Sequence, residues 1–122
     1  MSSVLDITVS SMVSAPHKAV TVIHANGHVD ASNAGEIEDA AMNAINSGAN
    51  CLLIDMGKVS FMSSAGFRSI HKIYQALHPE GGSGKLKILN PSDEIGRLVK
   101  TLGFNNFVAV LSGDLKQAVD SF

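Results

Sequence analysis

The chain has 122 residues, 45% of them hydrophobic and only 16% charged, so we expect it to fold as one domain over residues 1–122. Nine basic against eleven acidic side chains give a net charge of −2, which argues against a nucleic-acid-binding protein because such proteins need a basic face. Its single cysteine, Cys51, excludes an internal disulfide and a cysteine-rich zinc site, and it fits a reducing, cytoplasmic location.

No run in the sequence reaches the length of about 20 apolar residues that a membrane-spanning helix needs, so we expect no membrane insertion. No basic segment precedes an apolar run near the start of the chain, so no signal peptide is expected. The mean hydropathy is nonetheless positive, +0.19, which suggests a lightly charged surface suited to contact with a partner.

Two strands are predicted in the first part of the chain. In residues 4–13 apolar and polar side chains alternate at the period of a half-exposed strand, and residues 19–25 form a second strand-like run. Pro16 lies between them in a predicted turn, because proline fixes φ and lacks an N–H donor. Asn26-Gly27 is typical of a turn and is predicted to end the second strand.

After residue 30 the apolar period changes to that of a helix. The inward positions of this first helix are Ile37, Ala40, Ala41, Ala44 and Ile45. Ser32 or Asn33 is expected to cap its start, and Ser47-Gly48 is expected to stop it. The nearly all-apolar run 51–55 then predicts a strand buried on both faces, as in the centre of a parallel sheet.

A loop over residues 56–63 is predicted to lead into a second helix. The apolar stripe of this helix comprises Phe67, Ile70, Ile73, Tyr74 and Leu77. Pro79 and the glycine-rich stretch 81–84 end it, and residues 85–89 predict the next strand.

A third helix, a last strand and a terminal helix complete the chain. The third helix starts at residues 90–92 and stops at Gly103. Its predicted inward residues are Ile95, Leu98, Val99 and Leu102. The last strand is predicted over 107–111 and the terminal helix over 112–122. The order ββαβαβαβα predicts an α/β fold, with about four helices on a mixed, mostly parallel sheet of about five strands.

The spacing of the histidine, glycine and serine residues in the sequence predicts neither a catalytic nor a metal site. His71 and His78 lie about two helical turns apart, roughly 10.5 Å, which is too far to share one ion. His24 and His28 flank the predicted turn and can approach each other, but structural zinc usually takes four Cys or His ligands at close spacing. The sequence also lacks a phosphate-binding loop and a nucleophile elbow, so we predict neither an enzyme nor a cofactor.

The loop before the second helix carries the strongest functional signal. Ser63 and Ser64 stand where that helix begins, and serine there commonly caps a free backbone N–H, which stabilises the helix by about 1 kcal/mol. The same N–H groups and the positive end of the helix dipole also favour an anion. A phosphoserine would change the charge of this surface without disturbing the core. Capping and phosphorylation therefore both stay open for these serines.

The stretch 59–67, Val-Ser-Phe-Met-Ser-Ser-Ala-Gly-Phe, resembles the hallmark loop of STAS domains, in particular the small stand-alone bacterial anti-sigma factor antagonists. Segments 27–30, 53–56 and 98–104 are also similar to the family's pattern before its first helix, in its central strand and in its third helix. The resemblance covers nearly the whole chain and follows the element order derived above.

The resemblance implies a switch on which a partner acts. In such proteins the serine that corresponds to Ser64 accepts phosphate from an anti-sigma factor that is also a serine-protein kinase and binds the ATP itself. The unphosphorylated antagonist binds this partner and frees the sigma factor, and phosphorylation releases the antagonist. Ser63 replaces the family's usual Asp and is a second candidate acceptor.

The resemblance and the loop pattern together define the predicted partner-facing and loop-supporting residues. They are Asp30, Asp55, Phe61, Met62, Ser63, Ala65 and Gly66. Asp30 and Asp55 are expected near strand ends, where their carboxylates can hold the loop backbone, with ordinary turn and cap roles equally open. Two further functions stay open: a non-phosphorylated STAS adaptor subunit of a transporter or sensory complex, and a small enzyme.

Overall fold

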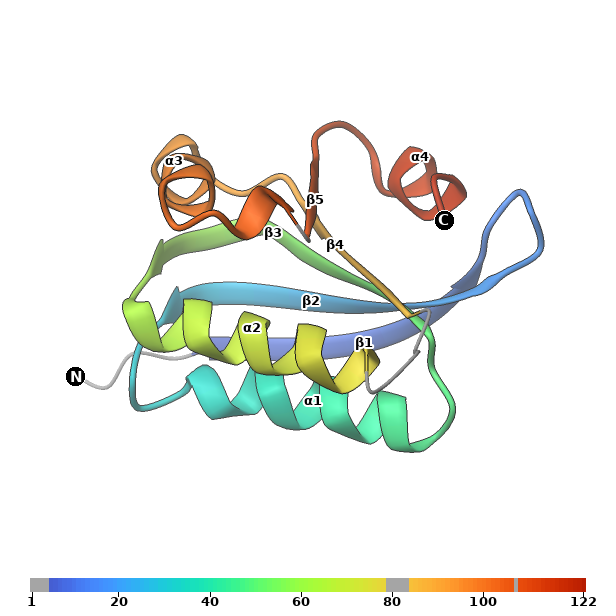
Figure 1. Cartoon of the computed structure of the whole chain (residues 1–122), viewed down its shortest axis with the longest axis horizontal. Helices are drawn as coiled ribbons and strands as arrows, with labels where there is room; N and C mark the ends of the chain where they lie inside the picture. Colours follow the sequence, from blue (N-terminus) through green and yellow to red (C-terminus); the bar gives the residue numbers. More distant parts are fainter. Residues whose placement is uncertain (1–4, 79–83, 107) are drawn as a thin grey trace.

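Five strands form one sheet in the order β1-β2-β3-β4-β5, and the computed structural model describes residues 5–78, 84–106 and 108–122 of the chain (Figure 1). The strands are β1 (Leu5–Val13), β2 (Ala19–Val29), β3 (Cys51–Met62), β4 (Lys85–Leu89) and β5 (Ala109–Leu111). The helices are α1 (Ala34–Asn46), α2 (Ser64–Leu77), α3 (Asp93–Thr101) and α4 (Leu115–Asp120), with a short 3-10 helix η1 (Phe104–Asn106). β1 and β2 are antiparallel and all other neighbouring strands are parallel, which confirms the predicted α/β fold class and element order.

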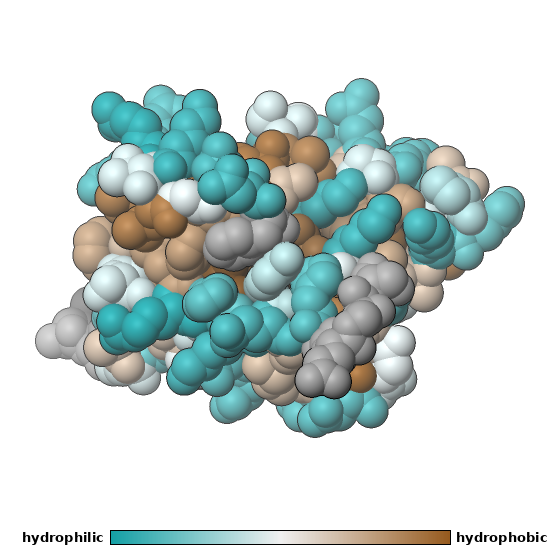
Figure 2. Space-filling view, viewed as in Figure 1, coloured by the Kyte–Doolittle hydropathy of each residue, from teal (hydrophilic) through white to brown (hydrophobic). Residues whose placement is uncertain are grey.

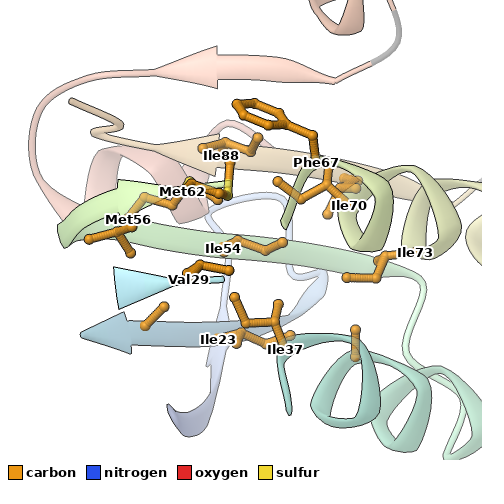
Figure 3. Packing of buried hydrophobic residues seen from close by; sticks show 14 of the residues in the cluster. Ile23, Val29, Ile37, Ile54, Met56, Met62, Phe67, Ile70, Ile73 and Ile88 are labelled. Atoms are coloured by element: carbon orange, nitrogen blue, oxygen red, sulfur yellow. The ribbon is translucent and has the colours of Figure 1, made fainter. Parts of the chain in front are cut away.

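Helices α1 and α2 lie side by side on one face of the sheet, and α4 covers part of the other face (Figure 1). On the first face, Ile23 and Ile54 of the sheet pack against Ile37 of α1 and Ile70 of α2 (Figure 3). Each of these four side chains is 0–1% exposed, and full burial of one such residue stabilises a fold by about 1.5–3 kcal/mol. This packing fixes α1 and α2 against the central strands.

The α4 face holds a second, smaller cluster. It comprises Val20, Val22, Cys51, Leu53, Leu89, Ala118, Val119 and Phe122. Polar bonds tie down the C-terminal end of α4: the Ala15 amide donates to Asp120 at 2.9 Å, and the Lys87 ammonium donates to the Ser121 carbonyl at 2.8 Å. The pKa of the Asp120 carboxyl lies below its usual value, first because Lys116 donates a hydrogen bond to it and then because the Ala15 amide does.

Two segments predicted as a turn and a loop are strand instead. β2 continues through Asn26-Gly27 to Val29, because Gly27 adopts φ 128° and takes part in an irregular, bulge-like register rather than in a turn. β3 continues from Asp55 to Met62, because the extended β2 gives it a parallel partner up to the Val29–Met62 pair. The predictions of a turn at residues 26–27 and of a loop over 56–63 are therefore wrong.

The predicted inward face of the third helix is half right. Ile95 and Val99 are buried in the cluster that α1 and α2 share, whereas Leu98 and Leu102 are 37% and 52% exposed. The helix is short and lies at the margin of the sheet. The sheet therefore buries a narrower stripe of its side chains than its apolar pattern predicts. Parts of the other predicted boundaries, at residues 4, 79–83 and 107, lie outside the described residues. Among the described residues, no helix combines the length and the apolar character needed to cross a bilayer.

Candidate functional site

The start of α2 is fixed by the ends of two parallel strands. The Ser63 amide donates to the Val29 carbonyl at 2.9 Å, which continues the β2–β3 pairing into the helix. The Ser63 carbonyl then accepts from the amides of Gly66 at 3.0 Å and Phe67 at 3.4 Å. These bonds place residues 63–66 at the carboxyl edge of the sheet, the edge at which open α/β sheets commonly bind ligands.

Gly66 allows α2 to approach the sheet closely. A Cβ at this position would lie 2.7 Å from Met62 Sδ and 3.0 Å from Val29 Cγ1, both of them buried side chains. Figure 3 shows Met62 and Val29 among the buried side chains of the core, to which Phe67 also belongs. The predicted supporting roles of Met62 and Gly66 are therefore roles in packing, which fix the height of the first helical turn above the sheet.

The two serines at this turn have different surroundings. Ser63 is the N-cap of α2, but its side chain makes no capping bond, and its Oγ is buried without a hydrogen-bond partner among the described residues. The Gly66 amide that a capping hydroxyl would satisfy is already bonded to the Ser63 carbonyl. Ser64 is the first helical residue and is exposed. The interpretation that a serine hydroxyl caps this helix is therefore wrong.

Exposed apolar and basic side chains lie near Ser64 in the chain. Phe61 is 47% exposed at the end of β3, and its ring lies 6.3 Å from that of His28 on β2. Arg68 is exposed one helical turn after Ser64, on the same side of α2. In Figure 2 apolar surface is visible at the end of the molecule where Figure 1 places the start of α2 and α3. The neutral hydroxyl of Ser64, the exposed ring of Phe61 and the Arg68 guanidinium therefore lie close together in the chain at this end.

Asp30 lies where it was expected, directly after β2 and beside the start of α2. Its carboxylate accepts hydrogen bonds from the amide and the hydroxyl of Ser32, and its amide donates to Asn33 Oδ1 at 2.9 Å. Asn33 is the N-cap of α1, and its side chain bonds back to Asp30 and to the His28 carbonyl instead of capping the helix. These bonds shape the turn between β2 and α1.

Asp55 does not lie at a strand end, so that prediction is wrong. It sits inside β3, roughly 20 Å along the strand from Met62. Its Oδ2 lies 3.1 Å from His24 Nδ1, and its Oδ1 accepts from the Gly57 amide at 3.1 Å. The carboxylate therefore acts on the sheet and not on the loop at Ser63.

A three-residue chain of hydrogen bonds runs across the α4 face of the sheet. Ser10 Oγ lies 3.2 Å from His24 Nε2, and His24 Nδ1 contacts Asp55, which joins β1, β2 and β3. This is the connectivity of a Ser-His-Asp triad, and the sequence did not reveal it because only the strand register brings the three residues together. Ser10 belongs to a regular antiparallel pair with Val22, and we interpret the chain as a tie that holds the strands where the β2–β3 register begins to shift.

His24 and His28 do not form a cluster of metal ligands with other described residues. His24 and His28 both lie within β2 instead of flanking a turn, and no group of three His, Cys, Asp or Glu side chains in the described residues is placed to hold a metal ion. A groove of about 790 Å³ lies between α3 and β5, and none of the predicted site residues lines it.

Comparison with known proteins gives one family and several similar structures. The model of the STAS domain family matches residues 12–121. The structure resembles the unphosphorylated form of the anti-sigma factor antagonist SpoIIAA, with a TM-score of 0.73 and 20% identity, over 95% of this chain and 96% of that one. It also resembles the phosphorylated form of SpoIIAA from Bacillus, with a TM-score of 0.72 and 21% identity, over 95% and 98% of the two chains.

An anti-sigma factor antagonist from Mycobacterium paratuberculosis is similar as well, with a TM-score of 0.73 and 22% identity, over 95% of this chain and 93% of that one. No curated protein matches the sequence significantly. At these identities the similar structures establish the fold, and the role of each residue has to be argued from this chain.

Proposed function

The chain belongs to the STAS domain family, and from that membership we propose that it is an anti-sigma factor antagonist whose switch is the phosphorylation of Ser64. The observation that supports this proposal best is the state of the two serines. The Ser64 side chain is exposed at the first position of α2, and neither serine hydroxyl is engaged in capping that helix. A hydroxyl at this position is accessible to a kinase active site.

In the unphosphorylated state this surface is neutral at Ser64 and apolar at Phe61. Such a surface suits burial against an anti-sigma factor, since interfaces place aromatic side chains at their centre and exclude unpaired charge. The partner, which is also the serine-protein kinase, binds the ATP. STAS proteins of this class need no cofactor of their own, and we propose none for this chain.

In the phosphoryl transfer, Ser64 Oγ attacks the γ-phosphorus of ATP, a new O–P bond forms, and ADP leaves with the electrons of the broken bond. The hydroxyl proton has to pass to a base. Ser63 offers no carboxylate beside Ser64, so the base and the magnesium ligands belong to the kinase. The contribution of this chain is to present the hydroxyl at a helix start that the sheet holds rigidly.

The phosphate would remain at the surface and would be tolerated by the fold. It would lie at the N-terminus of α2, where the helix dipole favours an anion, and one turn before Arg68. The same phosphate would oppose burial at the partner interface, because two negative charges would have to leave water there. Phosphorylation would therefore change docking and leave the folded structure in place.

The test uses a purified serine-protein kinase of the anti-sigma factor class from the same organism. The purified chain is incubated with the kinase and ATP, and intact mass and peptide mapping locate the added phosphate. Ser64→Ala should abolish the modification, while Ser63→Ala should retain it. A phosphate on Ser63, or one that survives in Ser64→Ala, would contradict the assignment of Ser64.

One observation favours a second candidate function. The residue before Ser64 is Ser63, whose Oγ is buried, where the resemblance predicts an Asp. A chain without that carboxylate suits a STAS adaptor that docks constitutively in a transporter or sensory complex. A chain that binds its partner tightly and gains no phosphate from the kinase would be such an adaptor.

A further inference from the structure

Strand β1 forms an open edge of the sheet that lacks the usual protection against pairing. The other edge strand, β5, covers only Ala109–Leu111, whereas β1 runs from Leu5 to Val13. β1 contains one charged residue, Asp6, no proline, and no irregularity in its register with β2. Natural edge strands are commonly blunted by shortness, charge, proline or bulges, and of these devices β1 has only the single charge of Asp6, near one end of the strand.

The hairpin defines which backbone groups of β1 are directed outward. The Ser14 amide donates to the Lys18 carbonyl at 2.9 Å, so residue 14 is hydrogen-bonded toward β2. Bonded and unbonded residues alternate along an antiparallel strand, so the even-numbered residues of β1 bond to β2. The odd-numbered residues, from Leu5 to Val13, therefore direct their N–H and C=O groups to the open edge.

The side chains of the same odd-numbered residues lie on the face of α1 and α2. Leu5 and Ile7 contribute to the core there, but Val9 and Val13 are 53% and 68% exposed. Val9 and Ile7 line a hollow of about 620 Å³ between β1 and α1. The edge thus combines unpaired backbone groups with exposed β-branched side chains.

We infer that β1 pairs with β1 of a second copy of this chain, antiparallel and with Val9 on the twofold axis. Only this register pairs the strand over its whole length. It places Val9 opposite Val9 and Ile7 opposite Ser11, and it places Leu5 opposite Val13. All of these residues have outward backbone groups, so each facing pair can exchange two hydrogen bonds. The two sheets become one continuous sheet that runs through both copies.

The distribution of charge favours a second copy as the occupant. In this register Asp6 lies opposite Met12 of the second copy, so the only charge of the strand is far from its own counterpart. Glu36 and Asp39 line the hollow beside Ile7, and the neighbouring hollow near Ser11 is lined by uncharged residues. In an antiparallel pair, the end of β1 near Glu36 and Asp39 in one copy therefore lies opposite the end near Ser11 in the other, where the lining residues are uncharged.

The inferred dimer is independent of the proposed switch. The family match begins at Met12, so most of β1, residues 5–11, lies before the matched range. Ser64 follows β3, two strands away from the open edge, so pairing through β1 leaves both switch surfaces exposed. Failure of the dimer test would leave the assignment of Ser64 intact. Failure of the phosphorylation test would likewise leave the inferred dimer intact.

The first test is the mass in solution, measured by analytical ultracentrifugation from micromolar to millimolar concentrations. The wild-type chain should convert from monomer to dimer as concentration rises. Ser11→Pro removes an outward N–H without breaking a bond to β2 and should abolish the dimer, while Ser11→Ala should retain it. A wild-type chain that stays monomeric, masses beyond the dimer, or a Ser11→Pro dimer would each overturn the inference.

A second test reads the register and does not depend on proline. Facing residues on the twofold axis have Cα atoms about 5.5 Å apart, within disulfide range. Val9→Cys should therefore crosslink two copies on oxidation about tenfold faster than Val13→Cys, whose opposite residue is Leu5. Val13 is the more exposed position, so random collision would give the reverse order. Equal rates, or faster crosslinking at residue 13, would overturn the register.

Discussion

Replacement of Ser64 by aspartate separates an effect on docking from an effect on folding. Ser64 is exposed at the first position of α2, so the substitution removes no buried contact. A negative charge at a helix start stabilises it by about 0.3–1 kcal/mol, and an exposed pair with Arg68 adds about 0.3–0.5 kcal/mol. We therefore expect the free energy of unfolding to stay unchanged or to rise by about 1 kcal/mol.

The effect on partner binding should be larger and of opposite sign. A carboxylate that has to be buried without a counter-charge costs several kcal/mol, so we expect the affinity for the anti-sigma factor to fall by about 100-fold or more. Calorimetric titration gives the affinity and urea unfolding gives the stability, with Ser112→Asp as a control that adds the same charge elsewhere. Binding of Ser64→Asp at wild-type affinity, or destabilisation by more than about 2 kcal/mol, would refute the reasoning.

Four further predictions concern stability, measured by urea unfolding. Gly66→Ala should destabilise the fold by about 1–3 kcal/mol, because its methyl group meets buried side chains, while Gly35→Ala, which has open space, should be neutral or stabilising by up to about 1 kcal/mol. Ser63→Ala should leave stability unchanged or slightly raised, because the hydroxyl is buried and has no hydrogen-bond partner in the described part of the chain. Ser92→Ala should cost about 1 kcal/mol, because its side chain caps α3. Asp120→Asn should be destabilising at neutral pH. The pKa of the Asp120 carboxyl in the folded chain lies below its ordinary value of 3.8, so its stabilising effect is complete above that value and is lost as the pH falls through the native pKa. The free energies of unfolding of the wild type and of Asp120→Asn should therefore converge in acid.

Each of these predictions can fail on its own. If Gly66→Ala and Gly35→Ala changed the free energy of unfolding equally, α2 would leave room for a methyl group between Gly66 and the sheet. A loss of about 1 kcal/mol in Ser63→Ala would show that this hydroxyl does cap the helix. If the free energies of unfolding of Asp120→Asn and of the wild type differed by the same amount down to strongly acidic pH, the carboxylate would act through its shape and not through its charge.

The sequence predicted the elements well because each depends on local periodicity. The inward positions of α1 and α2, such as Ile37 and Ile70, follow from helical spacing and are buried in the structure. Asn26-Gly27 shows where local information ends. A glycine with positive φ serves a turn or a bulge equally well, and the choice depends on whether another strand offers hydrogen bonds. Here the second half of β3 does so, and it lies more than thirty residues later in the chain.

The residues of the candidate site also differ in whether local sequence or long-range strand pairing fixes their positions. Met62 and Gly66 lie close to the two serines because they belong to the same loop motif, whereas Asp30 is brought there by the pairing of β2 with β3, through the bond of the Ser63 amide to the Val29 carbonyl. Asp55 was misplaced, because its partner His24 becomes visible only once the parallel register of β2 and β3 is known. The exposure of Leu98 and Leu102 also depends on how much sheet lies beneath a short helix, which periodicity does not contain.

The proposed switch requires that phosphate on Ser64 controls partner binding. Its most direct measurement is the affinity of the anti-sigma factor for two preparations of the wild-type chain, one unphosphorylated and one phosphorylated to completion on Ser64. We predict tight binding of the first and a loss of at least about 100-fold for the second, which corresponds to about 2.7 kcal/mol. Equal affinities of the two preparations would contradict the account.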